Sequence, residues 1–271
     1  MQSSETRYSI ENSPLRGTRR VFRAQRKSDG KLVLVKRTRQ LYPSPQEVAS
    51  LRHEFSVLSR VDCGHVARPL ELVESGGHIC LVLEQAPGQS LDEILAAGRP
   101  ELVRFTWLAL CVSRALASVH RLGVVHRDIK PQHFFVDEGR GEASLIDFGL
   151  ATELPRERQL PVEIDRLEGT LAYISPEQTG RTNRSVDRRS DLYSLGVTLY
   201  ELCTGQLPFD AKDALEVVHA HIARRPVSPR VHRPDLPEVL EGIIQRLLAK
   251  VPDDRYQTAA GLVADLERVH E

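Results

Sequence analysis

The sequence predicts an α+β protein with two lobes: a small front lobe with an antiparallel β-sheet and one main helix, and a larger, mainly helical back lobe. Turn residues separate short β-type segments in the first third of the chain, whereas helical periodicity dominates the rest. With 271 residues, 41% of them hydrophobic, the chain is long enough to bury the core of a bilobal domain. We place the lobes at residues 1–84 and 90–271, with a hinge at 85–89 where Pro87 and Gly88 interrupt the pattern.

The front lobe is predicted to contain two pairs of strands with a helix between them. Four segments rich in β-branched and other apolar residues are the expected strands: Val21–Arg26, Lys31–Lys36, Val66–Glu74 and His78–Glu84. The first two flank Ser28-Asp29-Gly30, which is typical of a hairpin turn. Apolar residues at helical spacing predict a helix from about Glu47 to Arg60.

The back lobe is predicted from segments that carry apolar residues on one helical face. Four such helices are expected, at Leu102–Leu122, Ser190–Cys203, Pro237–Lys250 and Thr258–His270. Gly123 and Gly205 follow the first two, as expected for residues that end helices. A cleft between two lobes is the first place to expect a binding site.

Composition argues against several classes of protein. Lysine plus arginine and aspartate plus glutamate both total 37, so the net charge is zero, and a dedicated nucleic-acid binder is not expected. The sequence holds no unbroken apolar run of about 18 residues and begins with a polar stretch, so neither a membrane span nor a signal peptide is expected. The four cysteines lie far apart and predict reduced thiols in a cytoplasmic protein, without a zinc site or a disulfide framework.

Short polar motifs follow one another along the chain in a specific order. They are His126-Arg127-Asp128-Ile129-Lys130-Pro131, Asp147-Phe148-Gly149, Ser175-Pro176-Glu177 and the segment Ser190–Gly196. Each motif alone is a weak signal, but their combined order and spacing are very hard to obtain by chance. The arrangement resembles the eukaryotic-type protein kinase family, over most of the chain. Residues 169–187 look similar to the kinase module that begins bacterial hybrid signalling proteins with ATPase and histidine-kinase parts.

This resemblance implies a bilobal protein-kinase-like fold that transfers the γ-phosphate of ATP to a serine or threonine hydroxyl of a protein substrate. Asp128 would accept the proton of the attacking hydroxyl, and Lys130 would stabilise charge on the phosphoryl group. Asp147 would hold Mg²⁺, with Mn²⁺ as the alternative metal, through hard carboxylate oxygens. Lys36 would reach the α- and β-phosphates and pair with Glu54 on the predicted helix.

The resemblance also assigns nucleotide contacts and structural residues. The residues expected around the nucleotide, besides Lys36, Glu54 and Asp147, are Val21, Leu34, Leu83, Glu84 and Phe135. Backbone groups of the hinge would bind the adenine. Glu177 is expected to pair with Arg255, and Asp191 is expected to cap its helix and anchor the backbone of the catalytic loop. Glu47 lies on the same predicted helix as Glu54 and is the alternative partner for the strand lysine.

The sequence departs from the family where the glycine-rich loop would cover the phosphates. The family's glycines fall at Pro14, Arg16 and Arg19, and the nearby Gly17 is one position out of register. Glycines let backbone N–H groups approach phosphates closely. Arg16, Arg19 and Arg20 either contact phosphate through their guanidinium groups or form a solvated basic edge.

Three further departures lie around the metal and the base. His133 stands where the family has a metal-binding Asn, and imidazole suits softer metals than Mg²⁺, so one of the two metal sites is in doubt. Leu34 and Phe135 are larger than the family's Ala and Leu, so they either crowd the adenine or reshape its pocket.

Arg127 is expected to pair with an activation-segment carboxylate, without phosphorylation, while Thr170 contacts the catalytic loop. The candidate carboxylates are Glu157, Glu163, Asp165 and Glu168.

One alternative to an active protein kinase is a weak or inactive pseudokinase that acts as a docking module. The other is a small-molecule phosphotransferase of the aminoglycoside-kinase type, a class that lacks the Ser-Pro-Glu segment.

Overall fold

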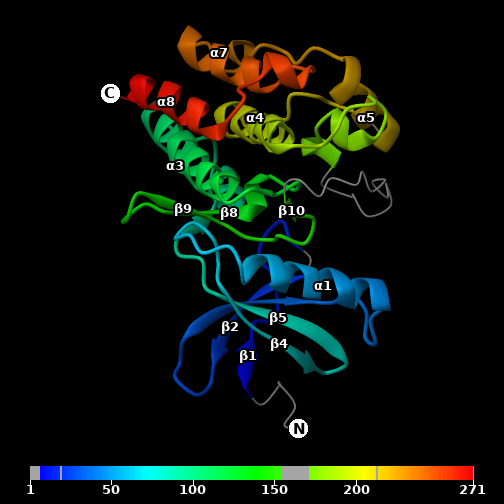
Figure 1. Cartoon of the computed structure of the whole chain (residues 1–271). Helices are drawn as coiled ribbons and strands as arrows, with labels where there is room; N and C mark the ends of the chain where they lie inside the picture. The colour runs from blue at the N-terminus through cyan, green and yellow to red at the C-terminus, as the bar shows by residue number, and fades with distance from the viewer. Residues whose placement is uncertain (1–6, 19, 154–170, 212, 271) are drawn as a thin grey trace.

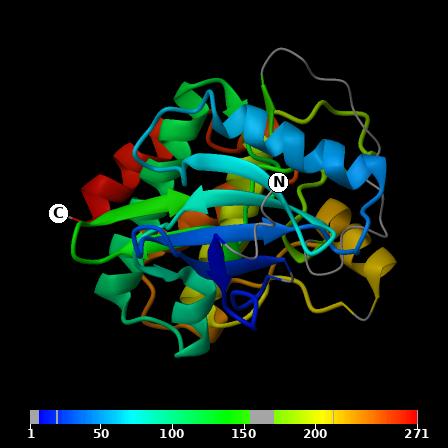
Figure 2. The ribbon, with the colours of Figure 1, turned by 90° about the horizontal axis from the view of Figure 1, so that it is seen from below.

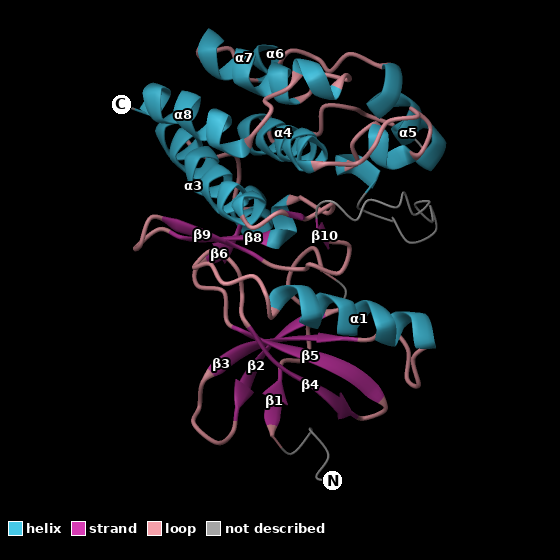
Figure 3. Cartoon of the chain, viewed as in Figure 1, coloured by secondary structure: helices cyan, strands magenta, loops and turns pink. Residues whose placement is uncertain are grey.

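The lobes lie one above the other in the computed structural model, which describes residues 7–18, 20–153, 171–211 and 213–270 (Figure 1). Long strands gather in the N-terminal lobe and helices in the C-terminal lobe, with short strands at the junction (Figure 3). The predicted α+β, two-lobed fold is therefore confirmed. All four cysteines have free thiols, as expected.

Within the described residues, the N-terminal lobe is built on one antiparallel sheet with the strand order β1-β2-β3-β5-β4. The strands are β1 (Tyr8–Ile10), β2 (Val21–Arg26), β3 (Leu32–Arg37), β4 (Pro69–Ser75) and β5 (His78–Glu84). The four predicted strands are present, whereas β1 was missed because three residues are too few for a periodic pattern. The two edges of the sheet approach each other, since Tyr8 Oη on β1 donates a hydrogen bond to Glu71 on β4, at 2.5 Å.

Helix α1 (Pro45–Leu58) lies alongside the sheet, as Figure 2 shows. Ser44 caps its first turn by accepting a hydrogen bond from the N–H of Glu47, and a proline follows the cap. The helix buries Leu51 and Leu58 together with one carboxylate, Glu54. Its apolar face thus directs Glu54 toward the lobe interior, beside β3.

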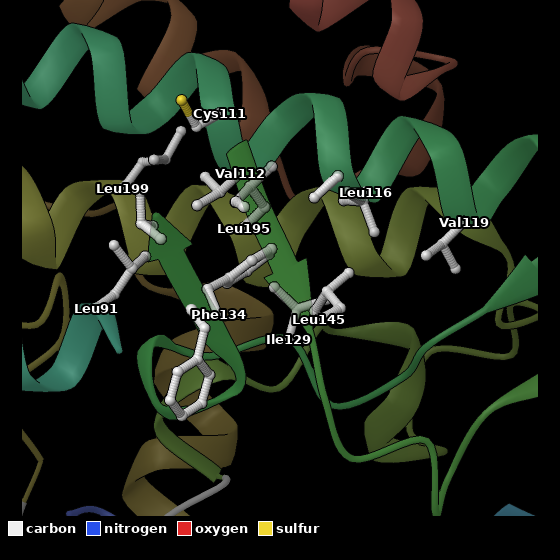
Figure 4. Packing of buried hydrophobic residues seen from close by; sticks show 14 of the residues in the cluster. Leu91, Cys111, Val112, Leu116, Val119, Ile129, Phe134, Leu145, Leu195 and Leu199 are labelled. Carbon is white, nitrogen blue, oxygen red and sulfur yellow. The ribbon is translucent and has the colours of Figure 1, made fainter. Parts of the chain in front are cut away.

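The C-terminal lobe contains the other helices of the described residues. They are α2 (Leu91–Ala96), α3 (Leu102–Arg121), α4 (Arg188–Thr204), α5 (Ala214–Ala223), α6 (Pro229–His232), α7 (Glu238–Leu247) and α8 (Ala259–His270). The four predicted helices appear with ends shifted by up to three residues; α2, α5 and α6 were not predicted. In the core, Val112 and Leu116 of α3 face Leu195 of α4, with Ile129 and Phe134 nearby (Figure 4).

Helix α3 is long and apolar enough to cross a membrane by length and composition alone. However, 67% of its most apolar window is buried inside the protein, as in the core helix of a soluble fold. Its buried faces pack against α4 and α8.

Short elements at the lobe junction hold the catalytic loop. They are the strands β6 (Gln89–Ser90), β7 (Val124–Val125), β8 (Phe134–Asp137), β9 (Glu142–Leu145) and β10 (Thr152–Glu153), and a 3₁₀ turn at Pro131–His133. Further 3₁₀ turns of the C-terminal lobe lie at Leu171–Tyr173, Glu177–Thr179 and Pro252–Asp254. Strand β8 pairs with β6 and β9, and β7 pairs with β10. The hinge rests directly on β8, because a Cβ atom at Gly88 would lie 1.8 Å from the Val136 carbonyl oxygen. Gly88 also has a φ of +86°, which favours glycine.

Candidate active site

A buried lysine links two carboxylates between the lobes. Lys36 Nζ on β3 lies 2.6 Å from Glu54 Oε2 on α1 and 2.5 Å from Asp147 Oδ1, which follows β9. The side chains of Lys36 and Glu54 are 3% and 0% exposed, so their charges are shielded from solvent. The other oxygen of Glu54 accepts a hydrogen bond from the Phe148 N–H. The structure thus brings Lys36, Glu54 and Asp147 together, as the sequence predicted, and places Glu47 beside Arg20 instead.

The charges in this cluster depend on one another. Burial alone would lower the pKa of Lys36, but the carboxylates of Asp147 and Glu54 outweigh it and raise that pKa. Burial opposes ionisation of Asp147 too, yet Lys36 and His133 hold its pKa well below the usual value. For Glu54, burial prevails and raises the pKa although Lys36 opposes it. The ammonium of Lys36 and the carboxylate of Asp147 are therefore both charged at neutral pH.

The two carboxylate oxygens of Asp128 differ in their contacts. Lys130 Nζ lies 3.0 Å from Asp128 Oδ2. The second oxygen, Oδ1, is buried and has no hydrogen-bond partner among the described residues. Burial would raise the pKa of Asp128, but Lys130 and His133 together lower it below the usual value. An ionised carboxylate with one unused oxygen is what a hydroxyl donor needs as a proton acceptor.

His133 bridges the two aspartates. Its Nδ1 lies 2.8 Å from the Asp128 carbonyl oxygen, which only accepts hydrogen bonds, so Nδ1 carries the proton. Burial lowers the pKa of His133 to about 4, so the ring is neutral at neutral pH. The lone pair is therefore on Nε2, which lies 3.6 Å from Asp147 Oδ2.

The donors present suit a divalent cation that is bound together with phosphate. Within the described residues there is no cluster of three or more metal-ligating side chains. Mg²⁺ typically takes one or two carboxylates and completes its shell with phosphate oxygens and water. Asp147 supplies such a carboxylate, and His133 adds a nitrogen that suits Mn²⁺ better than Mg²⁺.

Asp191 on α4 anchors the backbone of the catalytic loop. Its two carboxylate oxygens accept hydrogen bonds from the N–H groups of His126, at 2.8 Å, and Arg127, at 2.7 Å. Arg127 has a φ of +67°, an uncommon conformation for a non-glycine residue that these bonds hold in place. The expected anchoring is thus present, but the expected capping is not. Asp187 caps α4 instead, because it precedes the first turn and accepts a hydrogen bond from the Arg189 N–H.

Glu177 and Arg255 form a buried ion pair in the C-terminal lobe, as expected. The two side chains are 1% and 0% exposed and are joined by hydrogen bonds of 2.7 and 2.9 Å. Gln178, which the sequence analysis did not single out, donates a hydrogen bond to the Arg127 carbonyl oxygen. A lone glutamine carries no sequence signal for this role, which depends on the fold bringing two distant loops together.

The apolar residues expected around the adenine lie in one continuous cluster. Val21, Leu34, Leu83 and Phe135 are 0–3% exposed, and Leu15 belongs to the same cluster. Leu34 and Leu83 are cross-strand neighbours on β3 and β5, whereas Phe135 comes from β8 in the other lobe. Glu84 is exposed at the end of β5. The two enlarged side chains, Leu34 and Phe135, are thus packed into the core.

The loop arginines face carboxylates in this structure. Arg16 Nε lies 3.1 Å from Asp92 Oδ2, and an Arg20 nitrogen lies 3.8 Å from Glu47 Oε1. Arg16 is 62% exposed and Arg20 30% exposed, so these arginines form a partly solvated basic edge that also makes ion pairs. The contact with phosphate stays a prediction. Arg19 and the expected activation-segment partners, Thr170, Glu157, Glu163, Asp165 and Glu168, lie outside the described residues.

Comparisons with known proteins agree with this geometry. The protein kinase domain family matches residues 17–265. Serine/threonine-protein kinase PknB of Mycolicibacterium smegmatis is 34% identical over 83% of the chain, and its namesake in Mycobacterium tuberculosis is 32% identical over 83%. Serine/threonine-protein kinase pkn3 of Myxococcus xanthus is 33% identical over 93%. The chain spans 35% of the length of each PknB and 48% of pkn3.

Proposed function

Since this chain belongs to the protein kinase family, we propose that it transfers the γ-phosphate of ATP to a serine or threonine hydroxyl of a protein. The observation that carries this proposal is the buried Oδ1 of an ionised Asp128, which has no hydrogen-bond partner among the described residues. His133 links this aspartate to Asp147 of the Lys36–Glu54–Asp147 cluster. The relatives, which are named serine/threonine-protein kinases, support the class of acceptor. The finer resemblance to the kinase module of hybrid signalling proteins stays a prediction.

The residues divide the chemistry between binding and proton transfer. Lys36, held at the end of β3 by Glu54, places a positive charge where the α- and β-phosphates would lie. Asp128 Oδ1 would take the proton of the acceptor hydroxyl as its oxygen attacks the γ-phosphorus, and the bond from that phosphorus to the β-phosphate oxygen breaks. Lys130 would then stabilise the charge on the transferred group.

The metal would be held by Asp147, with His133 as a second donor. A bound divalent cation supplies charge neutralisation for the phosphates. Apart from that, the protein contributes orientation: the Phe148 N–H holds Glu54, Glu54 holds Lys36, and the lysine in turn contacts Asp147.

The direct test is transfer of γ-labelled phosphate from ATP to a generic protein acceptor, followed by identification of the phosphorylated amino acid. We expect metal-dependent label on serine or threonine, and loss of label in the Asp128→Asn variant. If ATP binds but no Asp128-dependent label appears with either Mg²⁺ or Mn²⁺, a non-catalytic docking module replaces the proposed kinase.

Metal preference is expected to change when His133 is replaced by asparagine. The amide oxygen of asparagine is a harder donor than the imidazole Nε2, so His133→Asn should raise turnover in Mg²⁺ severalfold. In the parent protein, Mn²⁺ should support more transfer than Mg²⁺, since it accepts nitrogen more readily. The measurement is initial rate against the concentration of each metal.

His65→Asn is the matched control for this prediction. His65 Nδ1 also contacts a backbone carbonyl oxygen at 2.8 Å, that of Ala143, but no catalytic carboxylate is among its contacts. The metal preference of this variant should equal that of the parent. Equal Mg²⁺ turnover in His133→Asn and the parent would contradict the assignment of His133 to the metal site.

A further inference from the structure

The loop between β1 and β2 is held down on the C-terminal lobe. Its described residues are 11–18 and 20, and they contain the single glycine that remains near the family's glycine-rich motif. In Figure 1 it is the blue segment that reaches from the N-terminal lobe toward the C-terminal lobe. Arg16 Nε in the loop lies 3.1 Å from Asp92 Oδ2 on α2. A charged contact thus joins this loop of the N-terminal lobe to α2 of the C-terminal lobe.

Gln132 of the catalytic loop completes this contact. Its Nε2 donates a hydrogen bond of 2.8 Å to the other oxygen of Asp92. Its side chain also lies against Gly17, where a Cβ atom would be 2.2 Å from Gln132 Cγ. Gly17 has a φ of +69°, so both its conformation and the close approach favour glycine there. This contact accounts for a glycine one position out of register with the family's motif.

The loop is also closed over apolar surface. Leu15 is 7% exposed and belongs to the cluster that contains Val21, Leu34 and Phe135. Its N–H donates a hydrogen bond of 2.7 Å to the Val21 carbonyl oxygen, and Thr18 donates back to the Leu15 carbonyl oxygen. The tip of the loop is therefore a hydrogen-bonded turn that is anchored at Leu15.

We propose that Arg16, Asp92 and Gln132 form a latch that holds the β1–β2 loop closed over the nucleotide site and slows nucleotide exchange. The proposal rests on the proposed kinase function, because it takes the nucleotide as the occupant of the site. Asp92 and Gln132 are positioning residues in it. The Arg16–Asp92 ion pair holds the loop in place, a role that contacts between glycine N–H groups and phosphate would otherwise have. Nucleotide enters and leaves when the latch opens.

The experiment compares the wild-type chain with Arg16→Gln, Asp92→Asn and the double variant. Release of a fluorescent N-methylanthraniloyl-ADP is followed after a chase with excess ADP. We expect each single variant to release the nucleotide about fivefold faster, since a half-exposed ion pair and one hydrogen bond are lost or weakened. The double variant should be no faster than either single one, because both changes open the same contact.

Arg23→Gln is the matched control. Arg23 Nη2 on β2 lies 3.2 Å from Glu93 Oε1 on α2, so this change also removes an ion pair between the lobes. It leaves the loop contacts intact, and its release rate should equal that of the wild type. Hydrogen exchange of the amides of residues 14–18, measured without nucleotide, should be faster in Asp92→Asn and unchanged in Arg23→Gln.

The outcomes separate the latch from the kinase function. Unchanged amide exchange in Asp92→Asn, or equal release rates in wild type and both single variants, overturns the latch. Additive effects in the double variant also overturn it. If the wild type binds no nucleotide at all, the proposed kinase function fails. In that case, amide hydrogen exchange that is faster in Asp92→Asn than in the wild type still supports the contact of Arg16 with Asp92 and Gln132.

Discussion

The Asp128→Asn variant is expected to lose phosphoryl transfer by about 100-fold to 10,000-fold, the usual contribution of a positioned general base. Asparagine has the shape of aspartate and can still accept a hydrogen bond from Lys130. In the wild type, Lys130 Nζ lies 3.0 Å from Asp128 Oδ2. It has no basic oxygen to take the proton at the position of Oδ1. The loss should appear in kcat, measured as initial rate of label transfer at saturating ATP.

Two controls make this result specific. Nucleotide binding by Asp128→Asn should be retained, because Lys36 and Asp147 are unchanged. Asp62→Asn is the same substitution at an exposed carboxylate, 85% accessible and paired with Arg68, and should leave transfer unchanged. Equal kcat in Asp128→Asn and the wild type would show that Asp128 is not the base.

The pH dependence gives an independent check on the same residue. Lys130 and His133 lower the pKa of Asp128 below 3.8 against the effect of burial. The carboxylate is therefore ionised at every pH above that value, and only protonation below it would remove the base. Activity lost between pH 6 and pH 7 would have to come from another group.

The Arg255→Met variant is expected to lower the free energy of unfolding by about 3–5 kcal/mol, because it leaves the buried Glu177 carboxylate without its partner. Both side chains are essentially inaccessible to solvent. Arg255 also donates hydrogen bonds to the carbonyl oxygens of Ala249 and Arg189, and these acceptors would lose their donor. The loss is measured as the shift of the urea unfolding midpoint at constant m-value.

Matched variants separate buried charge from lost side-chain volume. Arg268→Met makes the same change at a residue that is 79% exposed, and should alter stability by less than about 0.5 kcal/mol. Adding Glu177→Gln to Arg255→Met removes the unpaired charge and should recover part of the loss. If the two arginine variants are equally stable, the Glu177–Arg255 pair does not stabilise the fold.

Local sequence patterns predicted the elements whose signal extends over many residues. The helix at Leu102–Arg121 and the strands at Val21–Arg26 and His78–Glu84 were predicted because a buried face repeats with a fixed period along them. Strand β1 and helix α2 are too short to show such a period, and contacts from other parts of the chain hold them in place. The Tyr8–Glu71 bond is an example, since it joins the two edges of the curled sheet.

Motif order and residue identity along the chain were enough to predict the family and the kinds of side chain at the centre of the site. Which groups face one another became known from the folded arrangement alone. Among the described residues, Oδ1 of Asp128 has no hydrogen-bond partner, and His133 Nε2 lies opposite Asp147. Asp187 caps α4, and Arg16 pairs with Asp92. The physical reason is that hydrogen bonds and ion pairs depend on distances of a few ångströms between residues far apart in sequence, which no local pattern encodes.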